Sequence, residues 1–179
     1  MKSMKSKIMT FALLIMVTFG VLSCSKDDDS NNSISNAYVY GDDKVAIKWA
    51  GYNYYEDYGY AFTLMPTVPN SQTNWSDTDY FHVEVPVEKM GEKCYLNEDN
   101  IGQHWGLYLY FMHKGVEYRI NSTSDVDRND DVTGTNNWIK VTKNGTTGSN
   151  FTIEYEIMVK GKLLKGSYTG NFEPNTFVS

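Results

Sequence analysis

Apolar and polar residues alternate along most of the chain after Ala37, and this period of two predicts β-strands. The longest run spans residues 151–159, where the odd-numbered residues are apolar and most of the others are polar. Successive side chains of a strand point to opposite faces, so this segment is expected to bury one face and to expose the other. Shorter runs of the same kind occupy residues 44–49, 60–64, 81–88, 116–121 and 164–172. No stretch of the sequence after Ala37 has the 3.6-residue period of an amphipathic helix.

Glycine-containing turns separate these runs, as at Gly41, Gly115, Gly145 and Gly161. Glycine tolerates the positive φ that tight hairpins require, and short connections make neighbouring strands antiparallel. The sequence therefore predicts an all-β fold, a single antiparallel meander of about eight to ten strands. A β-sandwich and a closed β-barrel both satisfy this pattern, and the alternation does not choose between them.

The first 24 residues have the layout of an export signal. Lys2, Lys5 and Lys7 precede an uncharged stretch from Ile8 to Leu22, which is too short for the about 20 apolar residues of a membrane-spanning helix. The sequence Val21-Leu22-Ser23-Cys24 resembles the lipobox of bacterial lipoproteins. That resemblance implies that residues 1–23 are a signal peptide and that Cys24 carries acyl chains as the first residue of the mature protein.

Residues 24–36 are acidic and polar, which is typical of an extended, solvated tether. The run Ser25-Lys26-Asp27-Asp28-Asp29 resembles the export signal of Bacteroidota surface lipoproteins, which implies an outer-membrane location facing the cell exterior. The domain at 37–179, with its tyrosine- and glycine-rich first third and its closing hairpin at 151–172, resembles small Bacteroidota lipoproteins of calycin-like or sandwich fold.

Charge and cysteine content narrow the function further. The chain has 16 basic and 22 acidic residues, and cleavage of the signal removes three of the lysines. Such an acidic domain is a poor partner for nucleic acid, so we expect none. If Cys24 is acylated, Cys94 has no partner for a disulfide, and a lone cysteine in a strand-like segment is expected to be a small buried apolar residue.

Two groups of aromatic residues are candidates for ligand binding. Tyr54, Tyr55 and Tyr58 belong to a segment of closely spaced tyrosines, whose flat rings and hydroxyl groups suit sugar rings. Tyrosine is also a good strand residue that can simply cap a core, and this interpretation stays open.

The second group rests on the direction of side chains. Tyr108 and Tyr110 are expected opposite Leu109 and Phe111, which would make both faces of one strand apolar. Trp138 alternates with Ile139 and Val141 and is therefore expected to point away from the core. Outward aromatic side chains indicate a binding surface unless another part of the chain covers them.

The acidic segment Asp125, Asp127, Asn129 and Asp131 has oxygen ligands at alternating positions, as in the opening of a calcium loop. The sixth position is Asp130 instead of glycine and the twelfth is Asn136 instead of glutamate. A solvated acidic loop is therefore favoured over a weak calcium site, and we expect no other cofactor.

Catalytic motifs are missing from the sequence. His82, His104 and His113 do not have the spacing of metal ligands, and no nucleophile elbow or phosphate-binding loop is present. We therefore expect a lipid-anchored, non-catalytic binding module, with glycan as the first choice of ligand. An envelope structural or adhesive protein with protein partners is the alternative, and a hydrolase with a site invisible in the sequence is a third.

Overall fold

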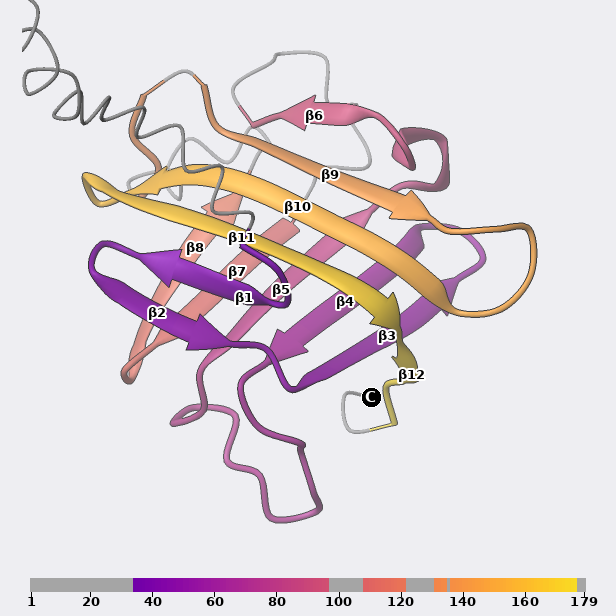
Figure 1. Cartoon of the computed structure of the whole chain (residues 1–179), viewed down its shortest axis with the longest axis horizontal. Coiled ribbons are helices and arrows are strands. Elements are labelled where there is room, and N and C mark those ends of the chain that lie inside the picture. Colours follow the sequence, from indigo (N-terminus) through magenta and orange to yellow (C-terminus); the bar gives the residue numbers. More distant parts are fainter. Residues whose placement is uncertain (1–33, 97–107, 122–130, 135, 177–179) are drawn as a thin grey trace, which may run out of the picture. The chain divides into compact units, whose positions relative to one another are not determined.

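The computed structural model describes residues 34–96, 108–121, 131–134 and 136–176, which form two six-stranded sheets (Figure 1). In spatial order, sheet A contains β2 (Asp43–Ala46), β1 (Ala37–Tyr40), β11 (Lys162–Asn171), β10 (Asn150–Val159), β9 (Trp138–Lys143) and β6 (Lys93–Tyr95). Sheet B contains β12 (Glu173–Pro174), β3 (Trp49–Tyr55), β4 (Gly59–Met65), β5 (Tyr80–Val85), β7 (Tyr108–His113) and β8 (Val116–Asn121). A short 3-10 helix, η1 (Val87–Lys89), follows β5.

The two sheets pack face to face as a β-sandwich, which decides between the two predicted architectures. The predicted all-β class is confirmed, and hairpins join β1 to β2, β3 to β4, β7 to β8, and β9 through β11. The strands do not follow one another in a simple meander, because the chain passes to the other sheet after β2, β5, β6, β8 and β11. The described residues contain twelve strands where eight to ten were expected for the domain, since strands as short as β6 and β12 leave almost no alternation to detect.

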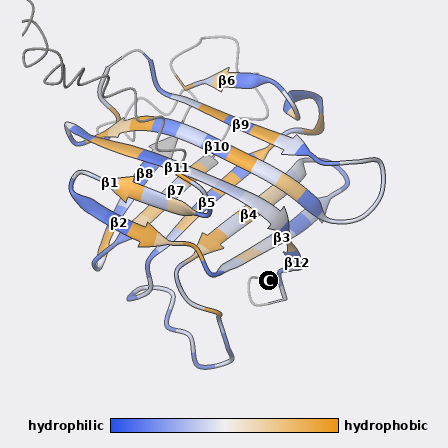
Figure 2. Ribbon diagram, in the orientation of Figure 1, coloured by the Kyte–Doolittle hydropathy of each residue, from blue (hydrophilic) through white to orange (hydrophobic). Residues whose placement is uncertain are grey.

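The core lies between the sheets and follows the predicted alternation closely. Along β10 every second residue from Phe151 to Val159 is buried, and its antiparallel partner β11 contributes Leu164. Figure 2 shows this alternation as changing hydrophobic and hydrophilic bands along β9 and β10. Each such side chain, once buried, stabilises the fold by about 1.5–3 kcal/mol through removal of apolar area from water.

Tyr155 occupies the centre of this core. Its ring stacks on Phe81 of sheet B with ring centroids 4.0 Å apart and planes 7° from parallel. On sheet A it lies against Gly166, where a Cβ atom would approach the Tyr155 ring to 2.3 Å. Glycine is therefore required at position 166 by the close approach of the tyrosine ring, since Gly166 itself has ordinary strand geometry.

The prediction of one amphipathic strand over residues 44–49 is wrong. β2 ends at Ala46 and β3 begins at Trp49, so the two intervening residues carry the chain from sheet A to sheet B. The amide of Ile47 donates to the Asn36 carbonyl beside β1, and the amide of Lys48 donates to the Met65 carbonyl in β4. The two residues between β2 and β3 thus make one hydrogen bond on the side of each sheet. Local alternation does not reveal such a long-range arrangement.

Candidate functional site

The β3–β4 turn presents three tyrosines to solvent, and we call Tyr54, Tyr55 and Tyr58 the tyrosine hairpin. Their exposed fractions are 54%, 43% and 61%. The turn ends at Gly59, where φ is +118° and an added Cβ would lie 2.4 Å from the Val85 carbonyl oxygen. Glycine therefore allows the turn to pack tightly against the end of β5, which fixes the position of the tyrosines.

The tyrosine hairpin rests on aromatic residues of the core. The ring centroid of Tyr54 lies 4.9 Å from that of half-buried Tyr60, and Tyr60 in turn stacks on Phe62 at 5.7 Å. Lys143, at the end of β9 in the other sheet, places its Nζ 6.0 Å from the Tyr60 ring centroid. The exposed Tyr54 ring is thus continuous with the packed interior, and the Tyr55 and Tyr58 rings contact each other at 6.3 Å.

Trp138 lies at a different place, on the outer face of sheet A, as the alternation predicts. Across four neighbouring strands it stands in one row of directly opposed residues, Tyr95, Trp138, Glu156 and Lys165, which we call the Trp138 row. The Nζ atom of Lys93 lies 4.0 Å from a ring centroid of Trp138 and 5.4 Å from that of Tyr95. A cation over an indole is attracted by the negative ring face, so Lys93 holds the indole in place.

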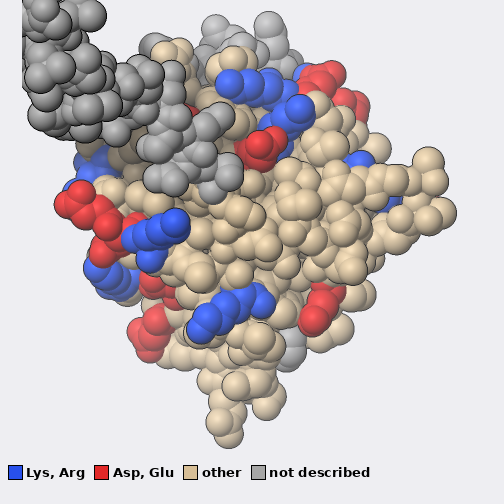
Figure 3. Space-filling model, viewed as in Figure 1, with Lys and Arg blue, Asp and Glu red and all other residues tan. Residues whose placement is uncertain are grey.

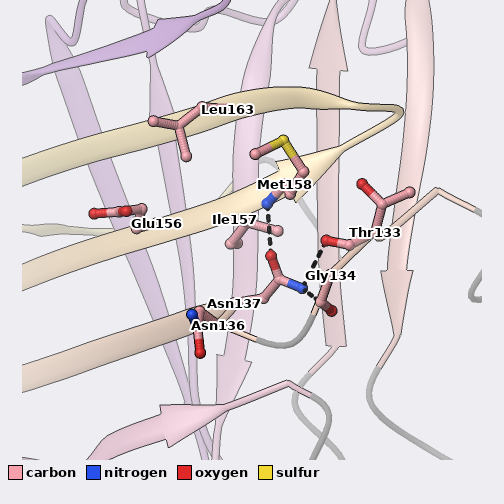
Figure 4. A pocket seen from close by; sticks show the side chains of 8 residues that line it. All are labelled: Thr133, Gly134, Asn136, Asn137, Glu156, Ile157, Met158 and Leu163. Atoms are coloured by element: carbon pink, nitrogen blue, oxygen red, sulfur yellow. Dashed lines mark hydrogen bonds between the residues drawn. The ribbon is translucent and has the colours of Figure 1, made fainter.

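A pocket of about 340 Å³ opens beside the Trp138 row (Figure 4). It is formed by the segment that precedes β9 and by the adjoining ends of β10 and β11. Its lining consists of Thr133, Gly134, Asn136, Asn137, Glu156, Ile157, Met158 and Leu163.

Asn137 fixes the shape of this pocket. It is buried, its side-chain nitrogen donates to the carbonyls of Thr133 (3.2 Å) and Gly134 (3.0 Å), and its side-chain oxygen accepts from the Met158 amide at 2.6 Å. These are the three contacts drawn in Figure 4. The sequence offered only the Asn136-Asn137 pair before Trp138 as a signal, and the pocket itself depends on β10 and β11, which come later in the chain.

Tyr110 lies on the outer face of sheet B, on β7. It is half-buried, and its ring centroid is 6.0 Å from that of His82 on β5. Tyr108 begins β7 opposite Glu84, but its side chain lies outside the described residues. Among the predicted aromatic residues whose side chains are described, Tyr55 and Tyr58 contact each other with ring centroids 6.3 Å apart, whereas Tyr54, Tyr110 and Trp138 each contact other residues.

A polar chain on the outer face of sheet B tests the hydrolase alternative. The Thr63 hydroxyl oxygen lies 3.0 Å from His82 Nδ1, and His82 Nε2 lies 3.5 Å from a carboxylate oxygen of Glu84. This order of hydroxyl, imidazole and carboxylate is that of a hydrolase nucleophile with its base. Thr63 is buried in the middle of β4, however, where an incoming carbonyl carbon has no access, so we assign these contacts to holding β4 and β5 together.

A polar cluster that the sequence did not predict lies at the end of the sandwich opposite the tyrosine hairpin. We call it the His113 cluster, and it consists of Tyr38, Asp43, Asp79, His113 and Lys114. The buried His113 ring places Nδ1 3.2 Å from Asp79 and Nε2 3.1 Å from Asp43. The Tyr38 hydroxyl donates to Asp79 at 3.3 Å, and Lys114 donates from its amide to Asp79 (2.7 Å) and from Nζ to Asp43 (2.6 Å).

The His113 cluster joins the β1–β2 hairpin of sheet A to the β7–β8 hairpin of sheet B. Hydrogen bonds from Lys114 and His113 lower the pKa of Asp43, while burial and the nearby Asp79 raise the pKa of the Tyr38 hydroxyl. All its polar groups have partners within the cluster, which is typical of a structural contact. Sequence reasoning placed His113 in a hairpin turn, and nothing local indicated its two carboxylate partners.

Of the predicted calcium ligands, Asp131 is described, whereas Asp125, Asp127 and Asn129 lie outside the described residues. One carboxylate oxygen of Asp131 lies 2.5 Å from Lys160 Nζ, and the other accepts from the Arg119 amide at 3.2 Å. Among the residues with described positions, no group of three or more acidic, histidine or cysteine side chains could hold a metal ion. The calcium site stays a prediction.

Of the two cysteines, Cys94 lies within the described range and Cys24 lies outside it. Cys94 is buried in β6, the environment expected from its sequence context. Within the described part of the chain, no helix is long and apolar enough to cross a membrane. No family model, curated protein or solved structure matches the chain.

Proposed function

We propose that this chain is a lipid-anchored protein of the bacterial cell surface whose β-sandwich binds glycan through the tyrosine hairpin. The observation that carries the proposal is the exposure of three tyrosines on one turn, where Tyr54 packs on the core residue Tyr60 and Tyr55 contacts Tyr58. Sugar rings stack their C–H faces on aromatic rings and bond their hydroxyls to polar groups, and tyrosine supplies both. Because Gly59 packs the turn tightly against β5 and Tyr60 contacts the Tyr54 ring, little conformational entropy of the turn is lost on binding.

The anchor half of the proposal rests on the lipobox-like sequence at Cys24. Two or more acyl chains on one cysteine hold a protein firmly in a membrane, since each buried methylene contributes about 0.8 kcal/mol. Intact-mass spectrometry of the protein from its native membrane should give a chain that starts at Cys24 and carries acyl mass. A full-length chain with a free Cys24 thiol would contradict this half alone.

The binding half is tested on the full chain in a detergent without a sugar headgroup, by affinity electrophoresis across neutral and anionic polysaccharides. Wild type should be retarded by at least one of them, and the double variant Tyr54→Ser/Tyr58→Ser should bind about tenfold more weakly. Val116→Ser is the matched control, because Val116 is an exposed apolar residue on the hairpin at the other end of the sandwich. Equal retardation of all three proteins would contradict the tyrosine hairpin as the site.

One observation favours the alternative of an adhesive protein. Val87, which is 50% exposed, belongs to the segment of backbone against which Gly59 packs, so an exposed apolar residue lies close to the turn that carries the tyrosines. Tyrosine is enriched at protein interfaces as well as at sugar sites. Failure to bind any polysaccharide, together with capture of one defined envelope protein that the double variant does not capture, would favour this alternative.

A further inference from the structure

The pocket beside Trp138 is separate from the tyrosine hairpin and opens onto the outer face of sheet A, the side of the molecule seen in Figure 3. We propose that this pocket and the Trp138 row form a second glycan subsite, which takes one neutral sugar residue. The proposal deepens the proposed function and rests on it in one respect, that the ligand of the protein is a glycan.

The size of the pocket fits a single small ring. At about 340 Å³ it is at the lower end of the range for ligand pockets, which run from about 300 to 1,000 Å³. The floor is rigid, because the Asn137 side chain bonds to the backbone at three points and the Thr133 amide donates to the Met158 carbonyl at 2.9 Å. A preformed floor does not have to be ordered when a ligand binds.

The rim offers the groups that a sugar uses. The carboxylate of Glu156 can accept hydrogen bonds from two adjacent hydroxyls of a sugar, as carboxylates commonly do. The Asn136 side chain and the Thr133 hydroxyl are exposed and make no hydrogen bond to any other described residue. Leu163, 39% exposed, supplies an apolar wall for the C–H groups of the ring.

Trp138 extends the site along the sheet. It stands directly opposite Glu156, so it is the neighbour on β9 of a residue that lines the pocket, although Trp138 itself does not line it. Lys93 positions the indole from the β6 side. A sugar residue in the pocket would therefore meet an aromatic surface where the next ring of an oligosaccharide begins, which is how short glycan chains are gripped.

The negative charge of Glu156 should decide whether the pocket binds neutral or acidic sugars. Glu156 is the one charged residue among the eight that line the pocket, and Lys165 lies 3.6 Å from its carboxylate without lining the pocket. A uronic acid in the pocket would bring a second carboxylate next to Glu156, which is unfavourable in a partly enclosed site. The pocket should therefore prefer neutral hexoses to uronic acids.

The test titrates the full chain, in a detergent without a sugar headgroup, with cellohexaose, mannohexaose, xylohexaose and an oligogalacturonate of equal length. Tryptophan fluorescence reports occupation of the Trp138 row, and calorimetry gives the affinity. For the neutral sugar that binds best, Glu156→Gln should weaken binding about tenfold and raise the relative affinity for oligogalacturonate. Trp138→Phe should remove most of the fluorescence change.

Glu154→Gln is the matched control, because Glu154 lies on the same face of β10, two residues from Glu156, and does not line the pocket. It should bind like wild type, and the fluorescence change should persist in Tyr54→Ser/Tyr58→Ser. If Glu156→Gln and Trp138→Phe both behave like Glu154→Gln while the tyrosine variant loses binding, the second subsite is wrong and the proposed function stands. If instead Glu156→Gln and Trp138→Phe lose binding while the tyrosine variant binds like wild type, the pocket is the main site. If wild type binds none of the sugars and no polysaccharide, both proposals fail.

Discussion

Tyrosines gather at both ends of the sandwich, but their surroundings differ. At the His113 end, Tyr38 and Tyr40 are buried between the sheets, and their hydroxyls reach Asp79 and the Val159 carbonyl. At the other end, Tyr54 and Tyr58 stand in solvent on a turn. The same residue type thus closes the core at one end of the sandwich and forms exposed surface at the other.

The largest expected effect is a difference in unfolding free energy between tyrosine variants at the two ends of the sandwich. Tyr38→Ala removes a buried aromatic ring and should lower the free energy of unfolding by about 3–5 kcal/mol. Tyr54→Ala at the exposed end should change it by no more than about 0.5 kcal/mol. Urea denaturation of the two variants and wild type measures both values. Similar losses in the two variants would mean that the tyrosine hairpin also supports the fold.

The second effect concerns the polar cluster beside Tyr38. His113→Ala leaves Asp43 and Asp79 without their imidazole partner in a partly buried site, so unfolding free energy should fall by about 1–3 kcal/mol. Val116→Ala in the same hairpin is the control and should stay near wild type. A His113→Ala protein as stable as its control would show that the cluster does not hold the hairpins together.

The third effect compares two buried hydroxyls. The Tyr38 hydroxyl contacts Asp79 and His113, whereas the Tyr155 hydroxyl is buried with no hydrogen-bond partner among the described residues. Tyr38→Phe should therefore cost about 1 kcal/mol, and Tyr155→Phe should be neutral or stabilising. Thermal and urea unfolding of both variants gives the comparison. A larger loss of unfolding free energy in Tyr155→Phe than in Tyr38→Phe would contradict this prediction.

The smallest effect is a change in acid sensitivity. Because Lys114 and His113 lower the pKa of Asp43 in the folded state, the stabilisation from this carboxylate is complete above its unfolded pKa, near 4. It is lost as the pH falls through the lower, folded pKa. Melting temperatures between pH 6 and pH 2 should therefore fall less for Asp43→Asn than for wild type.

A charge control sharpens the acid experiment. Asp42→Asn removes the same charge from the same turn but leaves the contacts of Asp43 with His113 and Lys114 intact. Its melting temperature should follow that of wild type into acid. If Asp42→Asn and Asp43→Asn are equally resistant, overall charge and not the His113 cluster explains the acid sensitivity.

The sequence predicted those features that depend on neighbouring residues. Alternation over 151–159 and 164–172 predicted the central hairpin of sheet A, and the position of Trp138 relative to Ile139 predicted its outer face. The turn at Lys160-Gly161 was also predicted, and both residues have positive φ there. These features follow from side-chain direction and turn chemistry, which act within a few residues.

The features that escaped prediction depend on distant contacts. The His113 cluster brings together Asp43, Asp79 and His113 from three parts of the chain, and none of them has a distinctive sequence neighbourhood. Trp49 was assigned to the strand before it, but its indole lies over Gly51 and donates to Glu173 near the C-terminus. The pocket likewise needs β10 and β11 to complete it. Sequence alternation gives no information on which strands will meet.

The place of β1 in sheet A has a consequence for biogenesis. The first strand of the domain lies between β2 and β11, so Ala37–Tyr40 finds one of its two partners in residues 164–167, near the far end of the chain. During synthesis or export, one edge of β1 therefore has no strand to pair with until almost the whole chain has emerged. An unpaired strand edge pairs readily with strands of other molecules. A nascent or truncated chain that ends before Lys162 is therefore expected to need a chaperone or to aggregate.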